Sequence, residues 1–95
     1  MQKFRIRYKP FPAELHGEIC GMVGGKPGGM LTVLIDSTLS DEEQKRTLKH
    51  ELAHIFLEHL NQEDRTYKDV EAEADAAAAR MTDTELEALL KLASA

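Results

Sequence analysis

Glycine and proline are confined to the first third of this sequence. All six glycines and all three prolines lie before residue 30, whereas alanine, glutamate and leucine are abundant in the residues that follow. Glycine and proline interrupt helices, and alanine, leucine and glutamate favour them. We therefore expect strands and turns first and helices afterwards. In 95 residues the two parts must share one core, because each half alone is too small to fold unaided. The expected organisation is a single domain over residues 1–95.

The N-terminal part contains three strand-like segments. Residues 3–9 alternate apolar and basic side chains, which is the period of a strand with one buried face. Residues 16–23 are a weaker candidate, and Met30–Asp36 is the clearest because it is rich in β-branched residues. The turn-rich segment 24–29 reverses the chain between the last two. A strand follows this segment, so we do not expect it to cradle a phosphate, which needs a helix at that place.

Two capping boxes mark helix starts in the second part. Ser40 with Glu43 opens a helix that should run to about Leu60, and Thr82 with Glu85 opens a short last helix. Between them, the alanine-rich segment 69–81 strongly favours a helix. The expected fold is α+β, with a small antiparallel sheet of about three strands packed on about three helices.

The composition excludes several classes of protein. A net charge of -5 disfavours general nucleic-acid binding, which needs a basic surface. No apolar run approaches the roughly 20 residues that span a bilayer, and the N-terminus lacks the apolar stretch of a signal peptide. The single cysteine, Cys20, cannot form an internal disulfide. We expect a cytoplasmic protein without a nucleic-acid or membrane partner.

An H-E-x-x-H motif, His50-Glu51-Leu52-Ala53-His54, lies inside the most clearly predicted helix. Residues 50 and 54 are one turn apart on the same face, so both imidazoles can bind one Zn²⁺. Glu51 projects from the neighbouring flank, where it can reach a zinc-bound water without becoming a ligand. The motif predicts a zinc site with Glu51 as the catalytic base.

A catalytic zinc needs a third protein ligand, and the next predicted helix offers carboxylates. Glu71 and Asp75 are four residues apart and share a face, whereas Glu73 points elsewhere. We expect Glu71 to be the third ligand and Asp75 to accept the free ring N–H of a ligating histidine. Glu73 remains the alternative third ligand.

The remaining histidines and the cysteine have simpler interpretations. His59 lies about 140° round the helix from His54 and is expected near the negative end of the helix dipole rather than on the metal. His16 is expected in a strand or loop. Cys20 is expected to be a small core residue of the second strand.

The segment Thr47–His59, together with Glu71-Ala72-Glu73-Ala74-Asp75, resembles the ImmA/IrrE family of zinc metallopeptidases, which are gluzincins. The likeness covers roughly residues 31–81. It implies a minimal zincin-like metallopeptidase fold and a zinc metallo-endopeptidase activity. The residue roles that it implies are Zn²⁺ binding by His50, His54 and Glu71, acid–base catalysis by Glu51, and support of a histidine by Asp75. It does not identify the residue that stabilises the oxyanion, for which Tyr67, His59 and Arg80 are candidates.

The expected function is hydrolysis of peptide bonds in a specific protein or peptide partner, because a domain of this size offers only a small substrate groove. The substrate would extend along Met30–Asp36, taken as an edge strand, or a homodimer would cover that edge. The alternative is a zinc-binding regulatory or interaction module with the same fold and no proteolysis. An accidental motif in a purely structural domain is a third hypothesis. A latent form, with the helix after Thr82 over the cleft, is a fourth.

Overall fold

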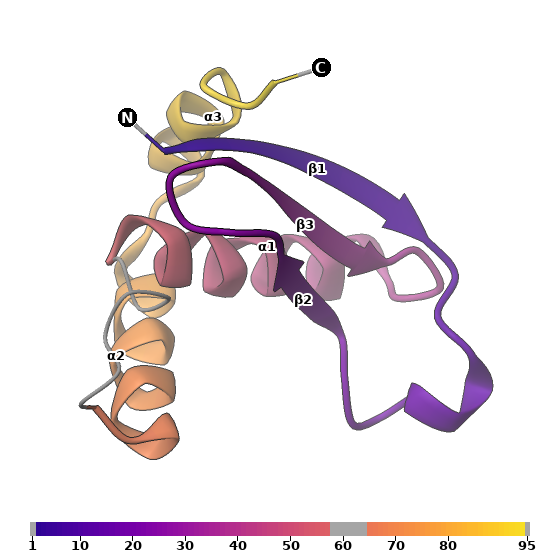
Figure 1. Cartoon of the computed structure of the whole chain (residues 1–95). Coiled ribbons are helices and arrows are strands. Elements are labelled where there is room, and N and C mark those ends of the chain that lie inside the picture. The colour runs from indigo at the N-terminus through magenta and orange to yellow at the C-terminus, as the bar shows by residue number, and fades with distance from the viewer. Residues whose placement is uncertain (1, 58–64, 95) are drawn as a thin grey trace.

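A computed structural model describes residues 2–57 and 65–94 of the chain (Figure 1). In chain order the elements are β1 (Lys3–Lys9), the 3-10 helix η1 (Ala13–Leu15), β2 (Gly21–Gly24), β3 (Met30–Asp36), α1 (Asp41–Phe56), α2 (Tyr67–Arg80) and α3 (Asp83–Leu90). The expected three strands and three helices of an α+β fold are confirmed. Among the described helices, none has the length and apolar character needed to cross a membrane.

The sheet is mixed rather than antiparallel. Its strand order is β1-β3-β2; β2 pairs antiparallel with β3, but β1 pairs parallel with it, with Phe4 opposite Leu31. Segment 10–20 carries the chain from the end of β1 across to β2 and reverses it, and the turn after β2 reverses it again. Two reversals restore the direction of β1, so the expectation of an antiparallel sheet is wrong for this pair.

The central position of β3 also corrects the expected edge strand. Leu31, Val33 and Ile35 of β3 are at most 1% exposed, and the strand has a hydrogen-bonded neighbour on each side. From Thr32 to Ile35 the strand is paired on both sides, so neither a substrate nor a second copy can add along this part of it. The two edges of the sheet are β1 and β2.

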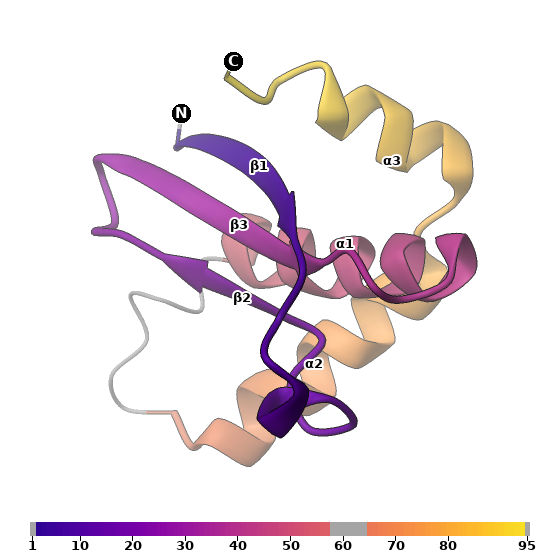
Figure 2. The same ribbon diagram turned by 90° about the vertical axis from the view of Figure 1, so that its right-hand side faces the viewer.

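The core lies between the sheet and α1, and α3 closes one end of it (Figure 2). Leu86 of α3 is 5% exposed and packs with the residues of β1, β3 and α1. The Ser94 backbone N–H donates to the carbonyl of Phe4 at 2.7 Å, which ties the segment after α3 to β1. The fully packed set is Phe4, Leu31, Val33, Ile35, Leu48, Leu52, Ile55 and Leu86.

The helix starts follow the capping pattern. Ser40 Oγ accepts the Glu43 backbone N–H at 3.2 Å, and Thr82 Oγ1 accepts that of Glu85 at 3.1 Å, so both capping boxes are confirmed. Within the described residues α1 extends to Phe56. The expected end near Leu60 lies outside them.

A buried carboxylate holds segment 10–20 to the end of β3. Asp36 is 2% exposed and accepts the backbone N–H groups of Phe11 (3.2 Å) and Thr38 (3.0 Å) and the Thr38 hydroxyl (2.8 Å). Burial alone would raise the pKa of Asp36, but these hydrogen bonds, with His16 nearby, hold it below its ordinary value. His16 Nε2 lies 3.8 Å from this carboxylate and 2.9 Å from the Phe11 carbonyl, consistent with the loop role expected for it.

Candidate metal centre

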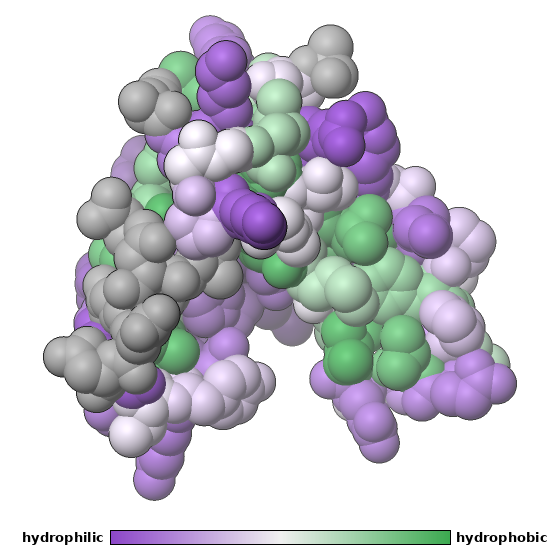
Figure 3. All heavy atoms as spheres, in the orientation of Figure 1, coloured by the Kyte–Doolittle hydropathy of each residue, from purple (hydrophilic) through white to green (hydrophobic). Residues whose placement is uncertain are grey.

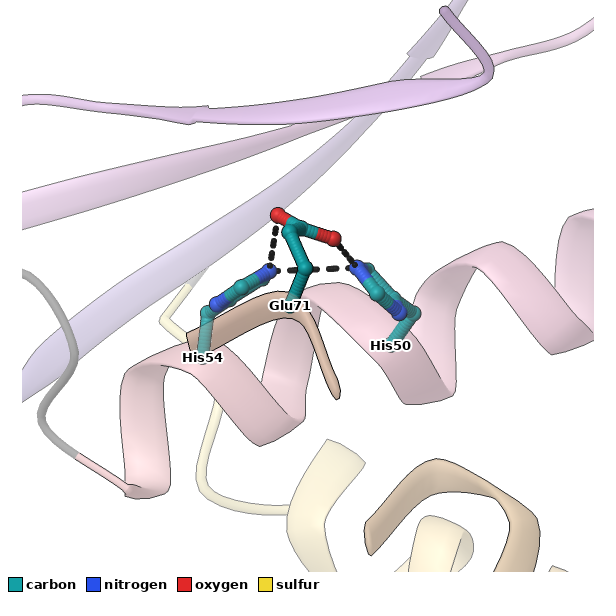
Figure 4. A group of neighbouring side chains, drawn as sticks. All are labelled: His50, His54 and Glu71. Carbon is teal, nitrogen blue, oxygen red and sulfur yellow. Dashed lines mark hydrogen bonds and ion pairs between the residues drawn. The ribbon is translucent and has the colours of Figure 1, made fainter. Parts of the chain in front are cut away.

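The two histidines of the motif lie on one face of α1 and point toward the same place (Figure 4). Their rings pack edge to face with centroids 4.7 Å apart, and the two Nε2 atoms are 3.1 Å apart. The helical spacing of four residues is sufficient to explain this convergence, because residues at i and i+4 are neighbours on one helix face.

Glu71 of α2 completes the cluster, with its carboxylate between the two imidazoles (Figure 4). Its Oε2 lies 2.9 Å from His50 Nε2, and its Oε1 lies 3.1 Å from His54 Nε2. The three side chains are partly buried, at 21%, 12% and 28% exposed. The structure therefore brings together the three residues that the sequence suggests as ligands.

The other two acidic candidates on α2 separate as the helical phase predicts. Asp75 lies one turn after Glu71, and its Oδ1 is 2.8 Å from His50 Nδ1. Glu73 instead pairs with Arg65, whose Nη1 lies 2.8 Å from Glu73 Oε2. Asp75 thus reaches the cluster from behind His50, while Glu73 contacts a residue outside it.

The polar atoms of the cluster are placed to share a proton or a cation. A neutral His50 whose Nδ1–H donates to Asp75 presents a lone pair at Nε2, and this lone pair faces the Glu71 carboxylate at 2.9 Å. Two acceptors at this distance repel one another unless a proton or a metal ion lies beside them. Two imidazole nitrogens and a carboxylate oxygen form a donor set that Zn²⁺ takes.

The spacing of the donors also fits zinc. All three ligand atoms lie within 4.8 Å of one another, and the closest contacts measure 2.9–3.1 Å. A tetrahedron with zinc–ligand distances of about 2.0–2.1 Å has edges of roughly 3.3–3.4 Å. The donors need only a small outward adjustment to reach that geometry.

Glu51 lines a cavity of about 600 Å³ together with two members of the cluster, His50 and Glu71. Residues 18–21, α1 and α2 line it, and Figure 3 shows the molecule hollowed between an apolar flank and a more polar one on the side of α2. Burial raises the pKa of Glu51 to about 7; a positive charge on His50 opposes this shift and the negative charge of Glu71 adds to it. Glu51 therefore lies beside the cluster without belonging to it.

A family model for the IrrE N-terminal-like domain, Peptidase_M78, matches residues 2–93. The chain belongs to this family. The match confirms the resemblance seen in the motif and extends it over the first thirty residues, which carry no part of that motif. The comparison with curated proteins returned no match, and neither did the comparison with solved structures.

The candidates for oxyanion stabilisation in this IrrE N-terminal-like domain are placed differently. Tyr67 lines the cavity and is 78% exposed. Arg80 is at the end of α2 and is not among the residues that line it. His59 lies outside the described residues.

The sequence did not predict the cavity wall that faces α2, which Cys20 and Gly21 form. Cys20, expected in the core, is exposed and lines the cavity of this domain together with Gly21. Strand β2 begins only at Gly21, so Cys20 belongs to the segment before it, although its carbonyl accepts the Asp36 backbone N–H at 2.9 Å. Gly21 is needed where the strand meets α1, because a Cβ there would lie 2.7 Å from Thr47 Cγ2; no pattern in the sequence announces this approach.

Proposed function

We propose that this chain is a zinc-dependent metallopeptidase that hydrolyses peptide bonds of a specific protein partner. The observation that supports it is the convergence of His50 Nε2, His54 Nε2 and the Glu71 carboxylate, with contacts of 2.9–3.1 Å, beside a cavity that His50, Glu71 and Glu51 line. Membership of a peptidase family also supports the proposed activity.

The chain's own residues divide the work. His50, His54 and Glu71 would hold the ion, which when bound lowers the pKa of water and polarises a peptide carbonyl. Asp75 accepts the Nδ1–H of His50 and so keeps Nε2 directed into the cavity. Glu51 takes a proton from the attacking water and delivers it to the leaving amine.

The substrate is proposed to lie along β2. This strand is an edge of the sheet, and its first residue, Gly21, lines the cavity. An exposed edge offers unpaired backbone groups to an extended peptide, which can add to the sheet as a further strand. Strand β2 thus takes the place that the sequence suggested for Met30–Asp36.

A second candidate function is a zinc-binding regulatory module without proteolysis. Among the described residues proposed to stabilise an oxyanion, Tyr67 alone lies at the cavity, and at 78% exposed it is not fixed there by packing. A site that binds zinc but lacks this stabilisation would cleave slowly or not at all.

Glu51→Gln tests the enzymatic proposal. The variant should fold and bind zinc like the wild type but lose at least about 10²-fold in peptidase rate, because proton transfer is removed while the ligands stay. Glu73→Gln is the matched control on α2, outside the cluster, and should keep both properties. Zinc-loaded wild type that cleaves its partner no faster than Glu51→Gln would leave only the regulatory module.

Metal content per chain tests the ligand set. Glu71→Ala should purify with less zinc than the wild type, whereas Glu73→Ala should keep it, as measured by elemental analysis after mild purification. If Glu73→Ala lost zinc and Glu71→Ala kept it, Glu73 would be the third ligand. A wild type without stoichiometric zinc after loading would contradict the metal site itself.

A further inference from the structure

The cavity continues past His50 by one turn of α1. The residues that line it around this turn are Arg46 and Thr47 of α1, Ala78 and Ala79 of α2, and Gly21 of β2. We call these five residues the Arg46 chamber. Four of them have small side chains or none, so the two helices and β2 leave space there instead of filling it.

Arg46 differs in charge from the other ionisable residues that line the cavity. Besides Arg46 and His50, the lining residues that carry a charge at neutral pH are acidic: Glu18, Glu51, Glu71 and Asp75. The neighbouring cations of α1 are engaged, because Lys45 and Lys49 contact Asp83 at 3.2 and 3.1 Å. The Arg46 side chain makes no hydrogen bond or ion pair with any residue in 2–57 or 65–94.

We propose that the Arg46 chamber is a subsite for an acidic side chain of the substrate, with Arg46 as the residue that selects it. The inference rests on the proposed function and specifies its substrate class. A guanidinium presents two parallel N–H donors that match a carboxylate, and small walls leave room for the incoming side chain.

The position of Arg46 sets the place of the acidic residue along the substrate. Arg46 and His50 are four residues apart on one helix, so their Cβ atoms are about 5–6 Å apart. An extended peptide advances roughly 3.3–3.6 Å per residue. The acidic residue therefore lies one or two positions from the bond that is cut.

Binding of matched peptide hydroxamates to the zinc-loaded protein tests the subsite without relying on turnover. Each pair carries glutamate or glutamine at the first or the second position from the hydroxamate, and isothermal titration gives the affinities. In one of these registers the glutamate peptide should bind wild type about threefold to tenfold more tightly than the glutamine peptide, the range for a partly exposed charge-assisted contact.

The variants assign that preference to Arg46. Arg46→Gln should abolish it, and Arg46→Glu should invert it in favour of a lysine peptide. Lys45→Gln is the matched control, because it removes an exposed cation one residue away and should leave the preference intact. Ala79→Leu should lower the affinity for the glutamate peptide, because the larger side chain fills the Arg46 chamber.

Two results would overturn the inference and leave the proposed function standing. These are equal binding of both peptides to wild type in every register, or an unchanged glutamate preference in Arg46→Gln. A protein that binds none of the hydroxamates after zinc loading would contradict the metal site. The proposed subsite would then be contradicted as well, because it depends on that site.

Discussion

His50 is held from two sides, and this decides which of its nitrogens faces the cavity. Nδ1 lies 2.8 Å from Asp75 and Nε2 lies 2.9 Å from Glu71. Asp75 is 71% exposed, so it is not placed there by burial in the core. Its position follows from the four-residue spacing to Glu71 on α2.

Asp75→Asn should weaken zinc binding by about 10–100-fold, the usual effect of removing a carboxylate behind a ligating histidine. The amide is neutral and supports the imidazole less strongly, while the three ligands stay in place. Competition with a chromophoric chelator measures the affinity. Asp69→Asn, in the first turn of the same helix, is the control and should bind zinc like the wild type. An Asp75→Asn variant with wild-type affinity would contradict the role given to Asp75.

The cluster itself was the most predictable part of the molecule. Two histidines four residues apart on a helix must share a face, and the same rule separates Glu71 and Asp75 from Glu73. Helical phase is a local property, so the sequence contains it. The exposure of Cys20 and the position of Arg46 depend instead on how β2 and α2 approach α1, and no local pattern encodes that.

The order of strands in the sheet shows the same limit. Alternation identified β1, and β-branched residues identified β3, because both signals arise within the strand. Whether β1 pairs parallel or antiparallel with β3 depends on segment 10–20, which crosses from one edge to the other and has no periodicity. The contacts of Asp36 with Phe11 and Thr38 hold that segment in place.

Acid should loosen the attachment of segment 10–20. The pKa of Asp36 is lowered in the folded chain, so ionised Asp36 stabilises the fold above its unfolded pKa of about 3.9, and this contribution is lost as the pH falls through the lower folded value. His16 is the titratable side chain that faces it, at 3.8 Å. Asp36→Asn should therefore be less stable than the wild type at pH 7, and the gap should close in acid.

Urea denaturation at neutral pH and at pH 3 measures that gap. Asp41→Asn, an exposed carboxylate in the first turn of α1, is the control and should show no comparable effect. A gap between Asp36→Asn and the wild type that widens as the pH falls would contradict the assignment.

The last helix belongs to the core of the folded chain. Leu86 packs with the buried side chains, and α3 supplies none of the residues that line the cavity. Figures 1 and 2 both place it at the far end of the molecule from segment 10–20, which leads to the cavity wall. The hypothesis of a latent form with this helix over the cleft is therefore wrong for this structure.

Leu86→Ala should lower the free energy of unfolding by about 2–5 kcal/mol, the cost of removing a buried leucine side chain. Leu92→Ala is the matched control, because Leu92 is 46% exposed and surface substitutions usually change stability by no more than about 0.5 kcal/mol. Urea denaturation measures both. Equal stability of the two variants would place α3 outside the core.

Helix α2 contributes one fully buried side chain, Ala74, among the residues that the structure describes. Burial of the Ala74 methyl group contributes little free energy. Polar contacts between α2 and α1 therefore contribute much of the free energy that holds α2 in place. The side chains proposed to bind zinc are among these polar contacts, so a bound ion would also hold α1 and α2 together. Loss of a bound zinc ion would then remove the proposed activity and loosen the attachment of α2 in the same step.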